Sequence, residues 1–226
     1  MPERSIALIN PNTNPQTTET MVRIAQDAVR RLAPATLIRI AEHTARSGPK
    51  MIVDMEELEH ARSTVASIVH ELADQRNQKP DAVIVSAFGD PGLEVAETCF
   101  PARAFGIGAE SMRTASRGGR RFAVATTTPG LVQGIDRIAE QLGLADKYCG
   151  TFVTQTDPSA LAAEPLRQRD ELADTIDMAV DVGGAEAVII GGGPLAASAR
   201  ELSSIMTVPL VQPIPEAVRS AVASLI

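Results

Sequence analysis

The residues best suited to chemistry lie in four short loops, each of which follows an apolar run of the sequence. A loop between a buried strand and a helix presents free backbone N–H groups and the positive end of a helix dipole, which favour a bound anion. The loops span residues 10–15, 86–92, 126–130 and 191–195. We therefore expect a site for a small anion where these loops converge.

The first loop, NPNTNP, offers Asn10 and Thr13 as substrate-binding side chains at the end of a strand. Pro11 and Pro15 restrict the backbone of this loop and so fix its turn. The same residues also suit a plain helix start, with Asn14 as the N-cap and Pro15 at the first helical position. The two interpretations are compatible.

The second loop, SAFGDPG, contains two candidate catalytic residues, Ser86 and Asp90, with Ala87 and Phe88 expected to contact the substrate. A carboxylate at the end of a strand can act as a general base. Asp90 directly precedes Pro91, so it also suits the N-cap of the following helix, and that role alone would explain it.

The third and fourth loops are rich in hydroxyls and glycines. Thr126 and Thr127 provide hydroxyl donors for a carboxylate, although Thr128 before Pro129 also suits a helix cap. In the fourth loop the substrate-binding candidates are small residues that let a ligand approach the backbone closely, namely Gly191, Gly192, Gly193 and Pro194. The loop lacks the Lys-Ser/Thr of a P-loop and the spacing of a dinucleotide motif, which argues against a nucleotide.

Two further candidate catalytic residues lie outside these loops. Glu110 is an acid or base if burial raises its pKa, or else a first-turn carboxylate of a helix. His43 lies in the polar segment 42–50, which could close over the site, whereas His60 and His70 fall inside a helical pattern and are expected at the surface or at its boundary with the core. The Cys and His residues lack metal-ligand spacing, so we expect no metal, and no nucleophile elbow is present.

The elements that position these loops form an α/β pattern. Continuous apolar runs are typical of strands buried on both faces of a parallel sheet, and they occur at 6–9, 36–40, 82–85, 104–107, 122–125, 151–153, 187–190 and 208–211. Amphipathic segments between them predict helices, among them 18–32, 55–75, 131–142 and 165–182.

The signals repeat in the same order along the chain: the run opening at Ile6 matches that at Phe122, and the run at Ala82 matches that at Ala187. This repeat predicts two pseudo-symmetric lobes, each with a four-stranded parallel sheet flanked by helices. We assign residues 1–98 and 205–226 to lobe 1 and residues 99–204 to lobe 2, with the active site in the cleft between the lobes.

Composition excludes several classes of partner. The 226 residues carry 21 basic and 28 acidic side chains, a formal net charge of −7, so we expect no nucleic acid and no membrane partner. No apolar stretch approaches the roughly 20 residues of a membrane span, and no leader pattern precedes Ile6. The two cysteines, Cys99 and Cys149, are too few for a disulfide framework, which predicts a cytoplasmic protein.

Five motifs resemble those of the hydantoin and allantoin racemases, a branch of the aspartate/glutamate racemase superfamily. They are INPNT at 9–13, FGDPGL at 88–93, GIGAE at 106–110, VATT at 124–127 and GAEAVIIG at 184–191. The motifs keep the family's order and span nearly the whole chain. The resemblance implies a cofactor-independent enzyme with two pseudo-symmetric α/β lobes, and it implies a homo-oligomer.

The resemblance also implies a mechanism for which the key residues are missing. In the family, one cysteine thiol removes the proton next to a carbonyl and a second returns a proton from the opposite face. This chain has Ala87 and Gly192 at those two positions. Cys99 and Cys149 are expected near the starts of strands, far from the strand ends, and so are interpreted as packing residues.

The sequence therefore supports two hypotheses. The first is an enzyme of this superfamily that acts on a small carboxylate or cyclic amide without two thiols, as an isomerase or as a diverged hydrolase or decarboxylase. Its proton transfer would depend on Asp90, Glu110, His43 or a bound water. The alternative is a non-catalytic protein that binds a small ligand on the racemase scaffold.

Overall fold

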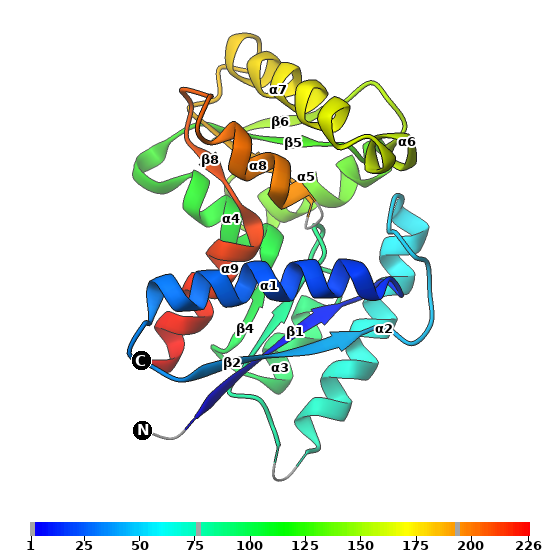
Figure 1. Ribbon diagram of the computed structural model, residues 1–226, viewed down its shortest axis with the longest axis vertical. Helices are drawn as coiled ribbons and strands as arrows, with labels where there is room; N and C mark the ends of the chain where they lie inside the picture. The colour runs from blue at the N-terminus through cyan, green and yellow to red at the C-terminus, as the bar shows by residue number, and fades with distance from the viewer. Residues whose placement is uncertain (1–2, 76–77, 193–194) are drawn as a thin grey trace.

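The chain folds into two α/β lobes, one below and one above the waist of the molecule in Figure 1. The computed structural model describes residues 3–75, 78–192 and 195–226. Each lobe contains one four-stranded parallel sheet, as the repeat predicts, and helices cover the sheet faces.

The first sheet has the strand order β2-β1-β3-β4. Central strand β1 pairs with β2 on one side and β3 on the other, so that Ile9 faces both His43 and Val85 across the ladders. The elements in chain order are β1 (Arg4–Asn10), α1 (Pro15–Leu32), β2 (Ile38–Thr44), α2 (Met55–Ala73), β3 (Ala82–Val85), α3 (Leu93–Cys99) and β4 (Ala104–Gly106).

The second sheet repeats this arrangement with the order β6-β5-β7-β8. After α4 (Ile107–Ala115) and the short 3-10 turn η1 (Arg117–Gly119), its elements follow in chain order. They are β5 (Phe122–Thr126), η2 (Pro129–Leu131), α5 (Val132–Gln141), β6 (Tyr148–Val153), α6 (Pro158–Ala163), α7 (Pro165–Asp181), β7 (Ala187–Ile190), α8 (Ala196–Leu202), β8 (Leu210–Val211) and α9 (Pro213–Leu225).

The two lobes exchange their last helices. α4 follows β4 of the first sheet but packs on α5, β7 and β8 of the second lobe, whereas α9 follows β8 of the second sheet but packs on α1, β3 and β4 of the first. Figure 1 shows α9 beside α1 in the lower lobe. α4 and α9 also pack against each other, so the waist is a helix–helix contact.

The observed strand pairing differs from the lobe boundaries expected from the sequence. β4 pairs with β3 and belongs to the first sheet, although residues 99–204 were assigned to lobe 2. β8 pairs with β7 and belongs to the second sheet, although residues 205–226 were assigned to lobe 1. The chain changes lobe only after each sheet is complete, because the backbone groups of β4 and β8 find their partners in the preceding strand.

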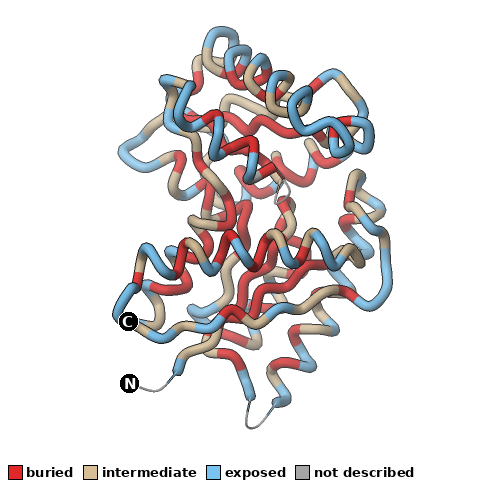
Figure 2. The backbone as a smooth tube through the Cα atoms, in the orientation of Figure 1, coloured by how far each residue is buried: buried red, intermediate tan, exposed pale blue. Residues whose placement is uncertain are grey.

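Strand and helix positions agree with the sequence pattern best where the elements are buried. β1, β3, β5 and β7 are almost wholly buried, and the red central strands in Figure 2 show this. The edge strand β2 extends to Thr44 rather than ending at Ile40, because its last residues are polar and half-exposed and so give no continuous apolar signal. Of the helices in the described part of the chain, none has the length and apolarity to cross a membrane.

Candidate active site

A small cavity of about 100 Å³ lies between the lobes, at the carboxyl ends of the central strands. This is the position where open α/β sheets bind ligands. All four predicted loops contribute to its wall, together with residues of α1, α5, α6 and α7. The lining residues are Asn12, Thr17, Met21, Met51, Ile52, Ser86, Ala87, Phe88, Thr126, Thr127, Thr128, Leu131, Ile135, Pro158, Ala162, Gln168, Gly191, Gly192 and Leu195.

Seven of the residues singled out in the sequence line this cavity: Ser86, Ala87, Phe88, Thr126, Thr127, Gly191 and Gly192. Gly193 and Pro194 lie outside the described residues. The two lobes meet at these loops, since a Cβ atom on Gly191 would lie 3.4 Å from the ring of Phe88.

Ala87 and Gly192, at the positions where the resemblance implies cysteines, both lie on the cavity wall. The two cysteines of the chain do not line the cavity. Cys99 is the last residue of α3, not the start of a strand as expected, and Cys149 lies near the start of β6. Both thiols are partly buried and free.

No described residue that lines the cavity carries a titratable side chain. The uncharged polar groups are hydroxyls and two carboxamides, and the remaining wall is largely apolar. Nor do three or more His, Cys, Asp or Glu side chains come together as a possible metal site in the described parts of the chain. The three titratable catalytic candidates therefore lie elsewhere.

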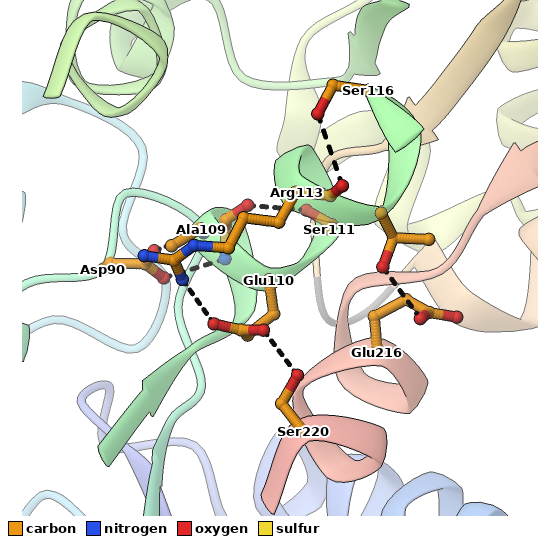
Figure 3. A network of polar contacts seen from close by, with 10 residues as sticks. Asp90, Ala109, Glu110, Ser111, Arg113, Ser116, Glu216 and Ser220 are labelled. Atoms are coloured by element: carbon orange, nitrogen blue, oxygen red, sulfur yellow. Dashed lines mark hydrogen bonds and ion pairs between the residues drawn. The ribbon is translucent and has the colours of Figure 1, made fainter. Parts of the chain in front are cut away.

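Asp90 is buried on another side of the waist, where it caps α4 (Figure 3). One carboxyl oxygen accepts a hydrogen bond from the N–H of Gly108 at 2.8 Å, and the other from the N–H of Ala109 at 2.6 Å. The expectation that Asp90 caps the helix after Pro91 is wrong, because α3 begins after Gly92 without a side-chain cap. The loop instead places Asp90, whose φ is +47°, against the first turn of α4.

Burial raises the pKa of Asp90 to about 7, and the nearby charge of Glu110 adds to this, whereas the two backbone N–H donors and Arg113 act in the opposite direction. Such a pKa suits a general base. Geometry argues against this role, because both carboxyl oxygens are engaged. Asp90 also lines a different hollow, of about 470 Å³, among charged residues of α2, α3, α4 and α5.

Glu110 lies in the first turn of α4, as the simpler interpretation predicts, and is paired there. Its carboxylate forms an ion pair with Arg113 and accepts a hydrogen bond from Ser220 of α9. Figure 3 shows that this side chain joins α4 to α9. Its position gives it a structural role in the exchanged-helix contact.

His43 lies on the edge strand β2 and contributes to a separate surface hollow with Arg39 and Gln26. Burial lowers its pKa, and the nearby charge of Arg39 lowers it further. The polar segment that follows it does approach the cavity, but through Met51 and Ile52 rather than through the histidine.

Asn10 and Thr13 shape the first loop and do not line the cavity. The buried amide nitrogen of Asn10 donates to the hydroxyl of Thr18 at 2.9 Å and to the side-chain oxygen of Asn12 at 3.0 Å. The hydroxyl of Thr13 donates to the carbonyl of Pro49 at 3.2 Å. Asn14 accepts from the N–H groups of residues 16 and 17, so the expected N-cap of α1 is confirmed.

Within the cavity wall, Thr126 connects two neighbouring strand ends. Its hydroxyl donates to the carbonyl of Gly191 at 2.7 Å and lies 3.0 Å from the hydroxyl of Thr128. Thr127 lines the cavity and is only 7% exposed, and its hydroxyl makes no hydrogen bond within the described residues. The hydroxyl of Ser86 donates to the sulfur of Met21 at 3.1 Å.

The residues that sequence reasoning missed come from segments outside the four loops. Residues 45–54 reach across the waist to η2, so closely that a Cβ atom on Gly130 would overlap the carbonyl oxygen of Val53. This segment brings Met51 and Ile52 to the cavity, and α7 brings Gln168. No local sequence signal marks these residues, since their place depends on how the lobes pack.

Comparison with known proteins identifies a family and a shared fold. Residues 6–221 match the family model described as Asp/Glu/Hydantoin racemase. The hydantoin racemase of Rhizobium meliloti is 29% identical over 224 residues, which cover 97% of this chain and 88% of that protein. The hydantoin racemase of Paenarthrobacter aurescens is 24% identical over 216 residues, which cover 96% and 89%.

The fold is also found among solved structures. The allantoin racemase from Pseudomonas fluorescens superimposes with a TM-score of 0.86 at 22% identity, covering 98% of this chain and 90% of that one. The two-lobed arrangement of parallel sheets is therefore the architecture of a known racemase fold.

Proposed function

The chain belongs to the Asp/Glu/hydantoin racemase family, and on that premise we propose that it is a cofactor-independent enzyme acting on a small cyclic amide in the cavity between its lobes. The observation that carries this proposal is the chemistry of the cavity wall. Its polar groups are uncharged and its other groups are largely apolar, which suits a neutral ring better than an amino acid or a dicarboxylate.

The size of the cavity supports the same substrate class. A volume of about 100 Å³ is small beside the roughly 300–1,000 Å³ of sites for drug-sized ligands. A five-membered ring with two amide groups matches this scale, and the curated relatives are named hydantoin racemases.

The proposed reaction is removal of a proton from the ring carbon next to a carbonyl, followed by its return. Ala87 and Gly192 have no ionisable group, so a hydroxide ion from solvent beside one of them takes the proton from the carbon and becomes water. The electron pair of the broken C–H bond moves onto the carbonyl oxygen, which gives an enolate. A water molecule on the opposite face then gives a proton to the carbon, which restores the C–H bond with the centre inverted, re-forms the carbonyl and regenerates hydroxide.

We assign to Thr127 the stabilisation of the negative charge that develops on the carbonyl oxygen. Thr127 lines the cavity and its hydroxyl makes no hydrogen bond in the described part of the chain, so it is available as a donor. A donor held in place before the reaction stabilises a developing oxyanion without reorganisation, and removal of one such donor costs roughly 10²–10³-fold in rate.

The alternative is a binding protein on the same scaffold. One observation favours it: no described residue of the cavity wall can act as a side-chain acid or base near neutral pH. In that case the cavity would hold the same class of ring without converting it.

One experiment separates the two functions. The protein is mixed with 5-methylhydantoin in D₂O, and exchange of the proton at the ring carbon is followed by NMR, with thermal shift as a measure of binding. We expect stabilisation together with exchange that is lost in Thr127→Val. The matched control Thr98→Val, an exposed position on α3, should exchange like the wild type.

Stabilisation without exchange in wild type would establish the binding protein instead. Stabilisation by glutamate or malonate but not by the ring would contradict the substrate class proposed above.

A further inference from the structure

Gln168 reaches the cavity from the first turn of α7, on the second lobe. Its side-chain oxygen accepts a hydrogen bond from the hydroxyl of Ser198 at 3.3 Å. Ser198 lies on α8 and is only 6% exposed, so the hydroxyl that holds the carboxamide is itself fixed by packing.

An amide side chain has one acceptor oxygen and an NH₂ group with two donors. In this structure the oxygen of Gln168 faces Ser198, and its NH₂ group has no partner within the described ranges. With this orientation the NH₂ group of Gln168 can donate a hydrogen bond to a ligand in the cavity.

The first lobe presents a matching group. The side-chain oxygen of Asn12 accepts from the amide nitrogen of Asn10 and from the backbone N–H of Asn14, each at 3.0 Å. Because a backbone N–H can only donate, these bonds fix the orientation of the amide. Its NH₂ group, like that of Gln168, has no partner in the part of the chain that the structure describes, and both residues line the cavity.

We propose that Gln168, positioned by Ser198, is a specificity-determining residue that donates a hydrogen bond to a carbonyl of the ligand. It thereby selects rings with two carbonyls, one for Gln168 on the second lobe and one for Asn12 on the first. The two carboxamides require acceptors at two points of the ligand. A ring with a single carbonyl satisfies only one of them. This inference rests on the proposed function, since it assumes a cyclic amide in the cavity.

The test compares ligands as well as variants. Dissociation constants of hydantoin, 2-imidazolidinone and 4-imidazolidinone are measured by calorimetry for wild type and for Gln168→Met, which keeps the length of the side chain and removes the amide. We expect Gln168→Met to weaken hydantoin binding about tenfold, the effect of one hydrogen bond. Binding of the ring that lacks the carbonyl facing Gln168 should change by less than about twofold.

Ser198→Ala tests the positioning role. It leaves Gln168 in place but frees its amide, so we expect a smaller loss for hydantoin and again little change for the single-carbonyl ring. The matched control is Gln141→Met, an exposed glutamine at the end of α5, which should bind all three rings like the wild type. Circular dichroism spectra and unfolding midpoints confirm that each variant is folded.

The outcomes distinguish this inference from the one on which it rests. Equal hydantoin affinity in wild type and Gln168→Met overturns the role of Gln168 while leaving the proposed function intact. Equal weakening of all three rings overturns the selection of a second carbonyl. If wild type binds none of the rings, the proposed function is wrong and this assignment falls with it.

Discussion

The carboxyl group of Asp90 occupies the space in which a side chain at Gly106 would begin. A Cβ atom at that position would approach the carboxyl atoms far more closely than the 3.0 Å that real Cβ atoms keep. Gly106 ends β4, and its neighbour Gly108 donates to the same carboxyl group. The loop after β3 and the start of α4 are therefore fitted to each other through one buried carboxyl group.

This fit predicts that Gly106→Ala is strongly destabilising, by about 2–4 kcal/mol, because the added methyl group displaces a buried carboxyl group from its donors. The φ of Gly106 is −97°, which alanine adopts freely, so backbone strain does not contribute. Urea unfolding measures the free energy. In an Asp90→Ala background the same glycine substitution should cost less than half as much; additive losses would contradict direct contact.

The pKa of Asp90 predicts a specific pH dependence of stability. The folded carboxyl keeps its proton up to about pH 7, whereas the unfolded one releases it near 3.8. Between these values the folded state binds more protons, so this group lowers the free energy of unfolding as pH rises from about 4 to 7, by at most about 1.4 kcal/mol per pH unit. Asp90→Asn removes this contribution.

The measurement is the difference between wild type and Asp90→Asn across that pH range. His43 contributes with the opposite sign, since its lowered pKa makes stability rise with pH below about 6.5. The difference between the two proteins cancels the contribution of His43. A difference that stays constant from pH 4 to 7 would show that the carboxyl is ionised throughout.

The positions of Asp90 and Glu110 predict that neither acts on the substrate. We expect Asp90→Ala to lose about 1–3 kcal/mol of stability with its cap, and Glu110→Ala to lose less, because Glu110 is only partly buried. Per folded molecule, both variants should exchange the ring proton of 5-methylhydantoin at the wild-type rate. A tenfold loss of that rate in either variant, at full folding, would return it to the list of catalytic candidates.

Thr126 predicts a coupling between stability and ligand binding. Its hydroxyl is the donor to the carbonyl of Gly191, so Thr126→Val leaves a buried acceptor unsatisfied and should cost about 1–3 kcal/mol. Ring binding should weaken as well, since the two strand ends separate. Thr126→Ser keeps the hydroxyl and should restore binding; if serine fails to rescue it, the methyl group rather than the hydrogen bond is responsible.

Replacing Ala87 and Gly192 together by cysteine should accelerate racemisation of 5-methylhydantoin or allantoin. Two thiols at these positions supply the acid and base that the cavity wall lacks, an effect of roughly 10²-fold or more. Optical rotation follows the reaction. Gly192 has φ +155°, a value that residues with a side chain rarely adopt. The single variant Gly192→Ala, which keeps Ala87, therefore serves as the control for backbone strain. An equal rate with cysteine at position 87 alone would show that position 192 takes no part.

Much of the fold was predictable because buried strands leave a continuous apolar signature. The helix predicted at 55–75 is found as Met55–Ala73, and that predicted at 165–182 as Pro165–Asp181. The prediction of two four-stranded sheets is confirmed. The crossover of α4 and α9 was not predictable in detail, because their apolar faces do not reveal which lobe they cover.

The site was predictable only in part, for a similar reason. Strand-end loops identify Ser86, Thr126 and Thr127 as neighbours, since the carboxyl ends of parallel strands share one edge. Whether a polar side chain in such a loop faces the ligand depends on its partners. Asn10 and Asp90 have donors and acceptors of their own that turn them into the protein, and Gln168 reaches the cavity from a helix with no signal at all.

The exchanged helices also constrain how the protein is made. Strands β1 to β4 leave the ribosome early, but α9, which packs on them beside α1, comprises residues 213–225. The part of that face formed by β3 and β4 therefore stays without α9 until the whole second lobe has been synthesised. During translation the N-terminal half exposes an apolar surface that its own polypeptide protects only at the end, and this is the stage at which a chaperone would find a binding site.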